Sequence, residues 1–179
     1  MTTRGLLSAV ALAMCAVAGS LQASPSFTRE PQGTTMTTAT KPHANEARNK
    51  ALVEAAFTAW RNGTGSPFDL LDDDASWTIV GRSEASRTYS SREAFMRDVI
   101  RPFNARMREP LKPSIRNIYT DGDTIVVFFD AAGTATDGVK YENTYVWFLK
   151  MRNDRIVEAH AFFDSIAFNE LWKRVPLSR

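Results

Sequence analysis

Residues 124–165 read TIVVFFDAAGTATDGVKYENTYVWFLKMRNDRIVEAHAFFDS, and this stretch decides the fold. Two pairs of turn residues, Asp137-Gly138 and Asn153-Asp154, divide it into three runs rich in β-branched and aromatic residues. Such pairs favour tight hairpins, because Gly, Asn and Asp tolerate the positive φ angles of two-residue loops. The stretch therefore predicts a β-meander with strands over residues 124–136, 139–152 and 155–165.

Upstream of the meander the sequence predicts mostly helices. Residues 45–61 carry large apolar side chains at three- and four-residue spacing, typical of an amphipathic helix, and Gly63 follows as a stop signal. The other predicted elements are a short helix at 67–71, a strand at 75–80, a loop at 82–89, a helix from Ser91 that Pro102 kinks or ends, a strand at 114–120 and a helix at 166–174. This order indicates an α+β domain with helices packed on one face of the sheet.

The first 23 residues have the pattern of a cleavable signal peptide. Arg4 precedes an apolar run that is shorter than the roughly 20 residues needed to cross a bilayer, and small residues then allow cleavage after Ala18 or Ala23. Residues 24–44, rich in Thr, Pro and Ser, are predicted to be a flexible leader before a domain at 45–175. We expect a periplasmic or secreted protein with no stable membrane insertion after signal removal; a retained anchor is the alternative.

Composition argues against several kinds of partner. The net charge is +2 with basic and acidic residues interspersed, so we expect no nucleic acid partner. The single cysteine, Cys15, lies in the segment to be removed, and two histidines are too few for a histidine-rich metal site. The run Asp72-Asp73-Asp74 is interpreted as a solvated turn. We therefore expect no metal and no cofactor.

The two hairpin turns predict which side chains share a face of the sheet. A two-residue loop at Asp137-Gly138 places Asp130 opposite Tyr145, and one at Asn153-Asp154 places Tyr145 opposite Phe162. One face then carries Asp130, Asn143, Tyr145, Trp147, His160, Phe162 and Asp164. The other is almost wholly apolar and carries Val127, Phe129, Thr144, Val146, Phe148, Ala159, Ala161 and Phe163. A one-residue change at either turn would swap part of this assignment.

The polar and aromatic face has two interpretations. If it lines a cavity, Asp130 or Asp164 is a candidate general base, Tyr145 a hydrogen-bond donor and His160 an acid or base. If it is the outer side of the sheet, Asn143 and Asp164 form a hydrogen-bonded pair. The aromatic residues then pack against a second protomer, because Trp and Tyr are enriched at interfaces.

The order of elements and four local motifs resemble the nuclear-transport-factor-2-like (NTF2-like) superfamily, in its SnoaL-like and ketosteroid-isomerase-like branch. The motifs are Asp74-Ala-Ser-Trp-Thr-Ile-Val-Gly81, Tyr141-Glu-Asn-Thr-Tyr145, Arg152-Asn-Asp-Arg-Ile156 and Val157-Glu-Ala-His-Ala-Phe-Phe-Asp164. The resemblance covers residues 45–175. It implies a cone-shaped fold in which a curved antiparallel sheet packs on three N-terminal helices.

The same resemblance bears on the site. It places the cavity positions of the last strand at Ala159, Ala161 and Phe163, which favours the outer-face interpretation of the polar residues. The positions that match the isomerase's base and oxyanion-hole residues hold Ile79, Phe57 and either Val146 or Trp147. Because none of these side chains can do that chemistry, the resemblance does not carry the isomerase mechanism to this chain.

These observations lead to one preferred function and two alternatives. The preferred function is an exported domain, dimeric through its sheet face, that binds a small, mostly apolar molecule in an aromatic cone. Its candidate ligand contacts are Phe57, Trp60, Trp77, Phe95, Phe103, Phe129, Val146, Ala161 and Phe163. The first alternative is an isomerase, cyclase or dehydratase that uses Asp164, His160, Asp130 and Tyr145. The second is a dimeric protein-interaction module.

Overall fold

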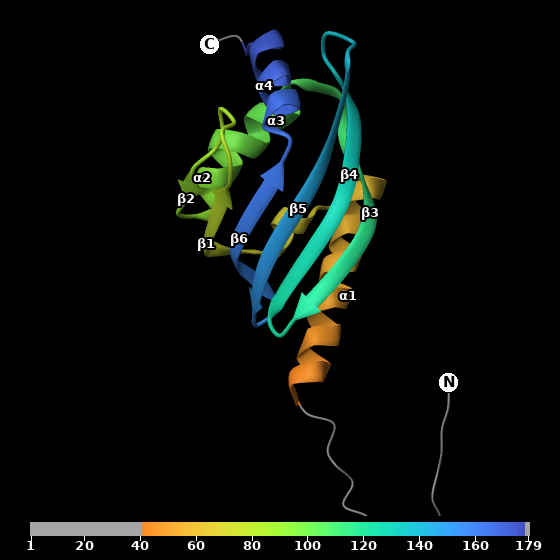
Figure 1. Cartoon of the computed structure of the whole chain (residues 1–179), viewed down its shortest axis with the longest axis vertical. Coiled ribbons are helices and arrows are strands. Elements are labelled where there is room, and N and C mark those ends of the chain that lie inside the picture. The colour runs from red at the N-terminus through yellow and green to blue at the C-terminus, as the bar shows by residue number, and fades with distance from the viewer. Residues whose placement is uncertain (1–40, 178–179) are drawn as a thin grey trace, which may run out of the picture. The chain divides into compact units, whose positions relative to one another are not determined.

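The computed structural model describes residues 41–177, so the predicted signal peptide and most of the predicted leader lie outside the described residues. The described part is an α+β domain built on one curved six-stranded sheet in the order β2-β1-β6-β5-β4-β3 (Figure 1). Its strands are β1 (Leu71–Ile79), β2 (Thr88–Tyr89), β3 (Met107–Asp121), β4 (Thr124–Ala135), β5 (Lys140–Arg152) and β6 (Arg155–Phe163). All neighbouring strands are antiparallel except β1 and β6, which run parallel. The predicted fold class is confirmed.

The first helix, α1 (Lys41–Asn62), begins four residues before the predicted helix and so includes the end of the predicted leader. Pro42 fits its first turn, because the first N–H groups of a helix have no partner within the helix. Gly63 ends α1 with a φ of 72°, and its N–H donates to the Trp60 carbonyl at 3.1 Å. The short 3-10 helix η1 (Pro67–Leu70) follows close to its predicted place.

A second helical segment has three parts: α2 (Arg92–Phe95), a π-helical turn η2 (Met96–Ile100) and α3 (Arg101–Ala105). Ser91 caps it by accepting a hydrogen bond from the Ala94 N–H at 3.2 Å. Pro102 does not end the segment. The wider π-helical turn lies immediately before it, where proline's missing N–H would interrupt the α-helical hydrogen bonds. The last helix is α4 (Ser165–Arg174).

The region around β1 corrects two predictions. Asp72, Asp73 and Asp74 belong to the strand rather than to a turn, at a shift in its pairing with β6 between Leu71 and Ser76. The predicted loop at 82–89 contains the short strand β2, in which Tyr89 pairs with Trp77. Both corrections depend on long-range strand pairing, which local composition does not show.

The hairpin between β4 and β5 is longer by one residue than predicted. Thr134 pairs with Lys140, and Ala135 donates its N–H to the Val139 carbonyl at 2.9 Å, so the loop has three residues. Gly138 adopts a φ of 86°, as the last residue of a three-residue loop with a bulge does. As a result Phe129, not Asp130, lies opposite Tyr145.

The hairpin between β5 and β6 has the predicted turn but a different register beyond it. Asn153 and Asp154 both have positive φ, 51° and 63°, and Arg152 pairs with Arg155 as a two-residue loop requires. The register then shifts, because Lys150 pairs with Glu158 while Met151 pairs with Ile156. Val157 is the extra residue of this bulge, and past it Tyr145 lies opposite Phe163 rather than Phe162.

These two shifts make the predicted face assignment wrong. Asn143, Tyr145 and Trp147 share the inner face with residues that were predicted to lie on the other face, among them Phe129, Ala161 and Phe163. Asp130, His160 and Phe162 lie on the outer face, where Thr144, Val146 and Phe148 are their cross-strand neighbours. Because side chains alternate along a strand, the two one-residue shifts together reverse the predicted faces of β5 relative to both β4 and β6.

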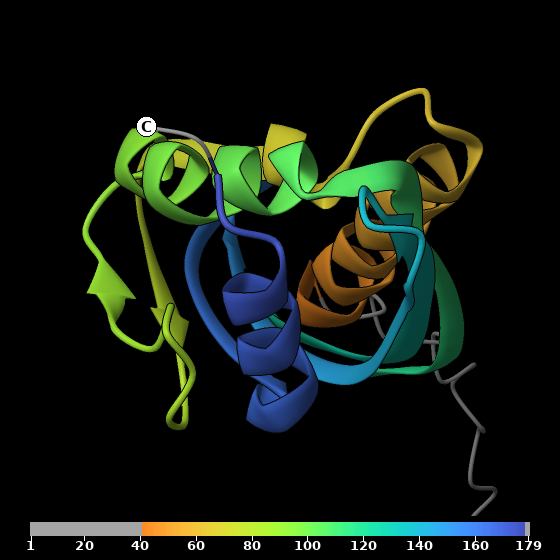
Figure 2. The same cartoon turned by 90° about the horizontal axis from the view of Figure 1, so that it is seen from above.

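The sheet curls around α1, and the α2–α3 segment crosses its open side (Figure 2). The core lies between these helices and the inner sheet face, where Val53 and Phe57 of α1 are fully buried together with Val127 and Phe129 of β4. Among residues 41–177 no helix is both long and apolar enough to span a bilayer.

Candidate functional site

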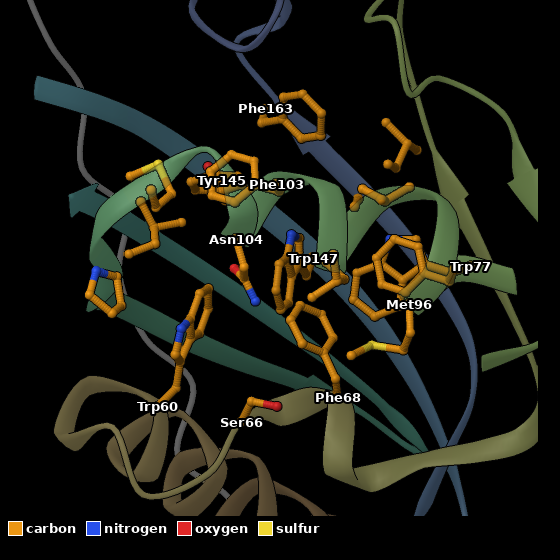
Figure 3. A pocket seen from close by; sticks show the side chains of 18 of the residues that line it. Trp60, Ser66, Phe68, Trp77, Met96, Phe103, Asn104, Tyr145, Trp147 and Phe163 are labelled. Atoms are coloured by element: carbon orange, nitrogen blue, oxygen red, sulfur yellow. The ribbon is translucent and has the colours of Figure 1, made fainter. Parts of the chain in front are cut away.

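A cavity of about 430 Å³ lies between the end of α1, the α2–α3 segment and the inner face of the sheet. Nine of its lining residues are aromatic, and side chains from α1, η1, β1, β5 and β6 converge on it (Figure 3). The cavity is within the range of small-molecule sites, which are mostly apolar clefts of about 300–1,000 Å³. Its only polar side chains among the described residues are those of Ser66, Asn104, Tyr145 and the tryptophan indoles.

Two stacked ring pairs shape the wall. Trp60 of α1 lies parallel to Trp147 of β5, with ring centres 5.9 Å apart, and Trp77 of β1 lies parallel to Phe95 of α2 at 4.5 Å. Trp77 also meets Trp147 edge to face at 5.0 Å, which joins the two pairs. Aromatic contacts of this kind favour fixed ring orientations, so the wall is preorganised.

The structure brings most of the predicted ligand contacts to this cavity. Its lining includes Trp60, Trp77, Phe95, Phe103, Ala161 and Phe163. Phe57 and Phe129 lie one layer behind, and each packs against the rings of Trp60 and Trp147. Val146 is the exception, because the register places it on the outer face between Phe128 and Phe162.

Several residues that line the cavity were not predicted from the sequence as ligand contacts. Trp147 was predicted on the opposite face because of the register error. In the structure it forms one stacked pair with Trp60 and contacts Trp77 of the other pair. Phe168 of α4 also lines the cavity, and its spacing to Leu171 and Trp172 is an apolar-stripe signal that could have marked it. Phe68 follows Pro67 in η1, where no local pattern shows which way an aromatic ring points.

The four candidate catalytic residues do not form one site. Only Tyr145 lines the cavity. Asp130 is on the outer face, where it accepts hydrogen bonds from the Thr144 hydroxyl at 2.7 Å and the Arg116 guanidinium at 2.5 Å. These contacts, with that from Thr144 the larger, hold the pKa of Asp130 below its ordinary value and make it a weak base.

His160 and Asp164 also have partners away from the cavity. The His160 Nε2 atom is 2.9 Å from a carboxylate oxygen of Glu158 on the outer face. The Asp164 carboxylate accepts a hydrogen bond from the Ile166 N–H at 2.8 Å and caps α4. An acidic residue directly before a helix is a capping signal that the sequence already contained.

Tyr145 links the cavity wall to a buried hydrogen-bonded group formed with Tyr141 and Asn143. Its hydroxyl is 3.1 Å from the Tyr141 hydroxyl, and the Asn143 side-chain amide donates to Tyr141 at 3.0 Å. The same amide donates to the Asp164 carbonyl at 2.9 Å. The amide oxygen accepts from the backbone N–H groups of Thr144 and Asp164, at 2.8 and 3.0 Å.

Burial governs the ionisation of the two tyrosines. It raises the pKa of Tyr145 well above its ordinary value, and the neighbouring Tyr141 raises it further. Burial also raises the pKa of Tyr141, against the opposing effect of hydrogen bonds with Tyr145 and Asn143. Both hydroxyls are therefore protonated at neutral pH and can donate a hydrogen bond.

The described residues offer no cluster for a metal ion. No group of three or more His, Cys, Asp or Glu side chains in residues 41–177 is arranged to hold one. The cavity lining among these residues includes no Asp, Glu, His, Lys or Arg side chain. What this arrangement can do is enclose an apolar molecule and offer it a few hydrogen-bond donors.

Solved structures of related proteins share the fold at low sequence identity. Bal32a, from a soil-derived mobile gene cassette, is 19% identical with a TM-score of 0.59, and the match covers 72% of this chain and 98% of that chain. An NTF2-like protein from Burkholderia thailandensis E264 is 17% identical with a TM-score of 0.58, covering 69% and 95%. TerC, co-crystallised with polyporic acid, is 19% identical with a TM-score of 0.56, covering 69% and 96%.

A search of the curated proteins gave no match. The sequence of residues 53–159, more than half of the chain, matches the SnoaL-like domain family. Together with the NTF2-like fold of the solved structures, this match shows that the chain belongs to the SnoaL-like domain family of the NTF2-like superfamily.

Proposed function

We propose that this domain binds one small, mostly apolar molecule in the aromatic cavity. The observation that carries the proposal is the cavity itself, which has about 430 Å³ of space and nine aromatic lining residues. A cavity of this size and lining is typical of sites that bury most of a small ligand's surface. The co-crystal of TerC with polyporic acid supports the proposal, since that protein has the same fold.

Binding is favoured over the acid–base chemistry that was the first alternative. That chemistry needs Asp130, His160 or Asp164 beside a substrate, but their hydrogen bonds lie on the outer face or at the cap of α4. A general base must come within hydrogen-bond reach of the proton that it removes, directly or through one water. Tyr145 alone among the four candidates meets the cavity, and its raised pKa makes it a donor rather than a base.

The cavity can be tested with N-phenyl-1-naphthylamine, a neutral dye whose fluorescence rises in apolar surroundings. We expect the domain to bind the dye and Ala161→Phe to weaken binding about tenfold or more, equivalent to ~1.4 kcal/mol. Ala161 is buried and lines the cavity, so a phenyl ring there takes the ligand's space.

The matched control is Val146→Phe, which adds a similar ring to the outer face. We expect this variant to bind the dye as the original chain does. Urea unfolding of both variants shows that each is folded. Equal dye affinity in the original chain and in Ala161→Phe would overturn the cavity proposal.

We also propose that the domain works outside the cytoplasm, on the basis of the signal-like residues 1–23. N-terminal sequencing of the protein from the exported fraction should give Gly19 or Ser24 as the first residue. A product that begins at Met1 in the cytoplasmic fraction contradicts export.

The predicted homodimer is proposed on the outer face, which keeps Phe162 from the predicted interface and replaces Tyr145 and Trp147 with Phe148. Phe148 and Phe162 are 40% and 43% exposed on the outer face, with their rings in edge-to-face contact at 5.9 Å. Lys150 and Glu158 flank them, so this face carries both charge signs. A two-fold interface requires such self-complementarity, because each patch meets a copy of itself.

Light scattering tests the dimer. We expect the mass of two chains for the original protein and of one chain for the double variant Phe148→Lys with Phe162→Lys. Val139→Lys, at an exposed site in the β4–β5 hairpin, is the control and should stay dimeric. A monomeric original protein would contradict the proposal.

A further inference from the structure

We propose that Asn143 and Tyr141 direct the hydroxyl hydrogen of Tyr145 into the cavity, where it binds the carbonyl oxygen of a neutral, otherwise apolar ligand. This inference rests on the proposed ligand-binding function and adds to it the chemical class of the ligand. It follows from counting the donors and acceptors in the buried group behind the cavity.

The orientation of the Asn143 amide is fixed by its backbone partners. Its Oδ1 atom is 2.8 Å and 3.0 Å from the N–H groups of Thr144 and Asp164, which can only donate. Its Nδ2 atom is 2.9 Å from the Asp164 carbonyl, which can only accept. The second hydrogen of Nδ2 therefore goes to the Tyr141 hydroxyl oxygen at 3.0 Å.

The two tyrosines then have one hydrogen more than they can use between them. Each hydroxyl carries one hydrogen, and the single bond between the hydroxyls, 3.1 Å long, takes only one of the two. If Tyr145 donates to Tyr141, the hydrogen of Tyr141 is left over. If Tyr141 donates to Tyr145, the hydrogen of Tyr145 is left over.

The position of the two side chains decides between these arrangements. Tyr141 is buried behind the wall against the Phe103 ring, and it is not part of the cavity lining. Among residues 41–177 the Tyr145 hydroxyl is the one acceptor in hydrogen-bond contact with the Tyr141 hydroxyl, so a hydrogen left over on Tyr141 would be an unsatisfied buried donor, which is costly. Tyr145 lines the cavity, so its hydrogen can be satisfied by a bound molecule. Asn143 therefore donates a hydrogen bond to Tyr141, Tyr141 donates one to Tyr145, and Tyr145 donates one to the ligand.

The acceptor on the ligand should be neutral. No Lys, Arg or His side chain lines the cavity among the described residues, and burying a carboxylate without a cation is costly. A ketone, quinone or ester oxygen meets this requirement, because it accepts a hydrogen bond without a charge. A hydrogen bond from Tyr141 to the Tyr145 oxygen also polarises the Tyr145 hydroxyl and strengthens its donation.

Two probes of the same shape separate this hydrogen bond from simple apolar burial. These are 2-acetylnaphthalene, a ketone, and 2-isopropenylnaphthalene, in which a CH₂ group replaces the ketone oxygen. The quantity to compare is the affinity for the ketone divided by the affinity for the alkene. We expect Tyr145→Phe to lower this ratio about fivefold, as loss of a hydrogen bond worth ~1 kcal/mol implies. Tyr141→Phe retains the Tyr145 hydroxyl but removes its donor, and should reduce the same ratio about twofold, a smaller cooperative effect.

The infrared carbonyl band of the bound ketone gives a second readout that does not depend on affinity. In the original chain we expect the band at lower frequency than for the ketone in hexane, and in Tyr145→Phe we expect it to return toward the hexane value. An unshifted band in the original chain, or a ketone-to-alkene ratio that Tyr145→Phe does not change, would overturn the proposed hydrogen bond from Tyr145 to the ligand. If the alkene still binds in that case, the cavity proposal stands. If neither probe binds the original chain, both proposals fail.

Discussion

At the scale of single residues, Asn143 is the side chain on which the site most depends. It makes four hydrogen bonds, two to each end of its amide, and so satisfies the whole side chain inside the protein. The outer-face interpretation had Asn143 and Asp164 as a hydrogen-bonded pair; the two residues are hydrogen-bonded, but on the inner face and through the Asp164 backbone. The Asp164 carboxylate is thereby left to cap α4.

The buried tyrosines give the stability of the domain a characteristic alkaline dependence. Their pKa values are raised by burial in the folded state, so at pH values below about 10 they are protonated in both states and their contribution is complete. Above that pH the unfolded chain loses these protons first, and stability falls as pH rises toward the raised pKa values. Each group adds at most about 1.4 kcal/mol per pH unit to the fall.

We therefore expect the double variant Tyr141→Phe with Tyr145→Phe to lose stability less steeply between pH values of about 9.5 and 11.5. Urea unfolding across this range measures the slope, and comparing slopes cancels the hydrogen bonds that the variant lacks at every pH. Parallel curves for the two proteins would show that the tyrosines are not ionised more readily in the unfolded chain.

At the scale of elements, the two hairpins show what local sequence can and cannot establish. Asn153-Asp154 predicted a two-residue turn correctly, because both residues must adopt positive φ and these residue types tolerate it. Asp137-Gly138 suits a two-residue or a three-residue loop equally well, since Gly138 has positive φ in either. The Asp137 side chain also accepts a hydrogen bond from the Val139 N–H at 3.0 Å. The local sequence did not show which of the two loop lengths this contact accompanies.

The bulge at Val157 could not be predicted from its own neighbourhood. Nothing in Ile156-Val157-Glu158 differs from an ordinary strand pattern. The bulge coincides with the parallel pairing of β1, in which Leu71 meets Ile156 and Ser76 meets Glu158. Because that partner lies far away in the sequence, the face of His160 and Phe162 was settled by tertiary structure.

The Asn153-Asp154 turn leads to a prediction about backbone strain. Asn153→Val places a β-branched side chain at a φ of 51°, and we expect it to lower the free energy of unfolding by about 1–2 kcal/mol. Asn153→Gly should change the same free energy by less than about 0.5 kcal/mol, since glycine adopts this φ freely. Urea denaturation compares the two variants, and an equal loss in both would contradict the role of the turn.

At the scale of the whole described domain, the order of elements carried most of the prediction. Helices followed by a meander were sufficient for the fold class, and the large aromatic residues of α1 and the α2–α3 segment were correctly expected near a cavity. Trp60, Phe95 and Phe103 needed only to point toward the sheet to meet there, and Trp77 of β1 lines the same cavity. The contribution of β5 was missed, because Trp147 and Tyr145 reach the cavity only in the observed register.

The site that results is an apolar chamber with one directed donor, and acid–base residues lie outside it. The sequence predicted acid–base roles for carboxylates and a histidine because the faces of the strands were assigned from an incorrect register. In the structure these side chains lie outside the cavity, so the acid–base roles lose their support. Glu158, Arg116 and Thr144 already engage the outer-face candidates, and α4 engages Asp164. We therefore propose that the function of the domain resides on the inner face of the sheet.

A crystal structure of the domain with 2-acetylnaphthalene tests this proposal most directly. We expect the naphthalene rings against Trp60, Trp147 and Phe163 in the cavity, with the ketone oxygen within hydrogen-bond distance of the Tyr145 hydroxyl. Naphthalene density on the outer face beside Phe148 and Phe162, with none in the cavity, would contradict it.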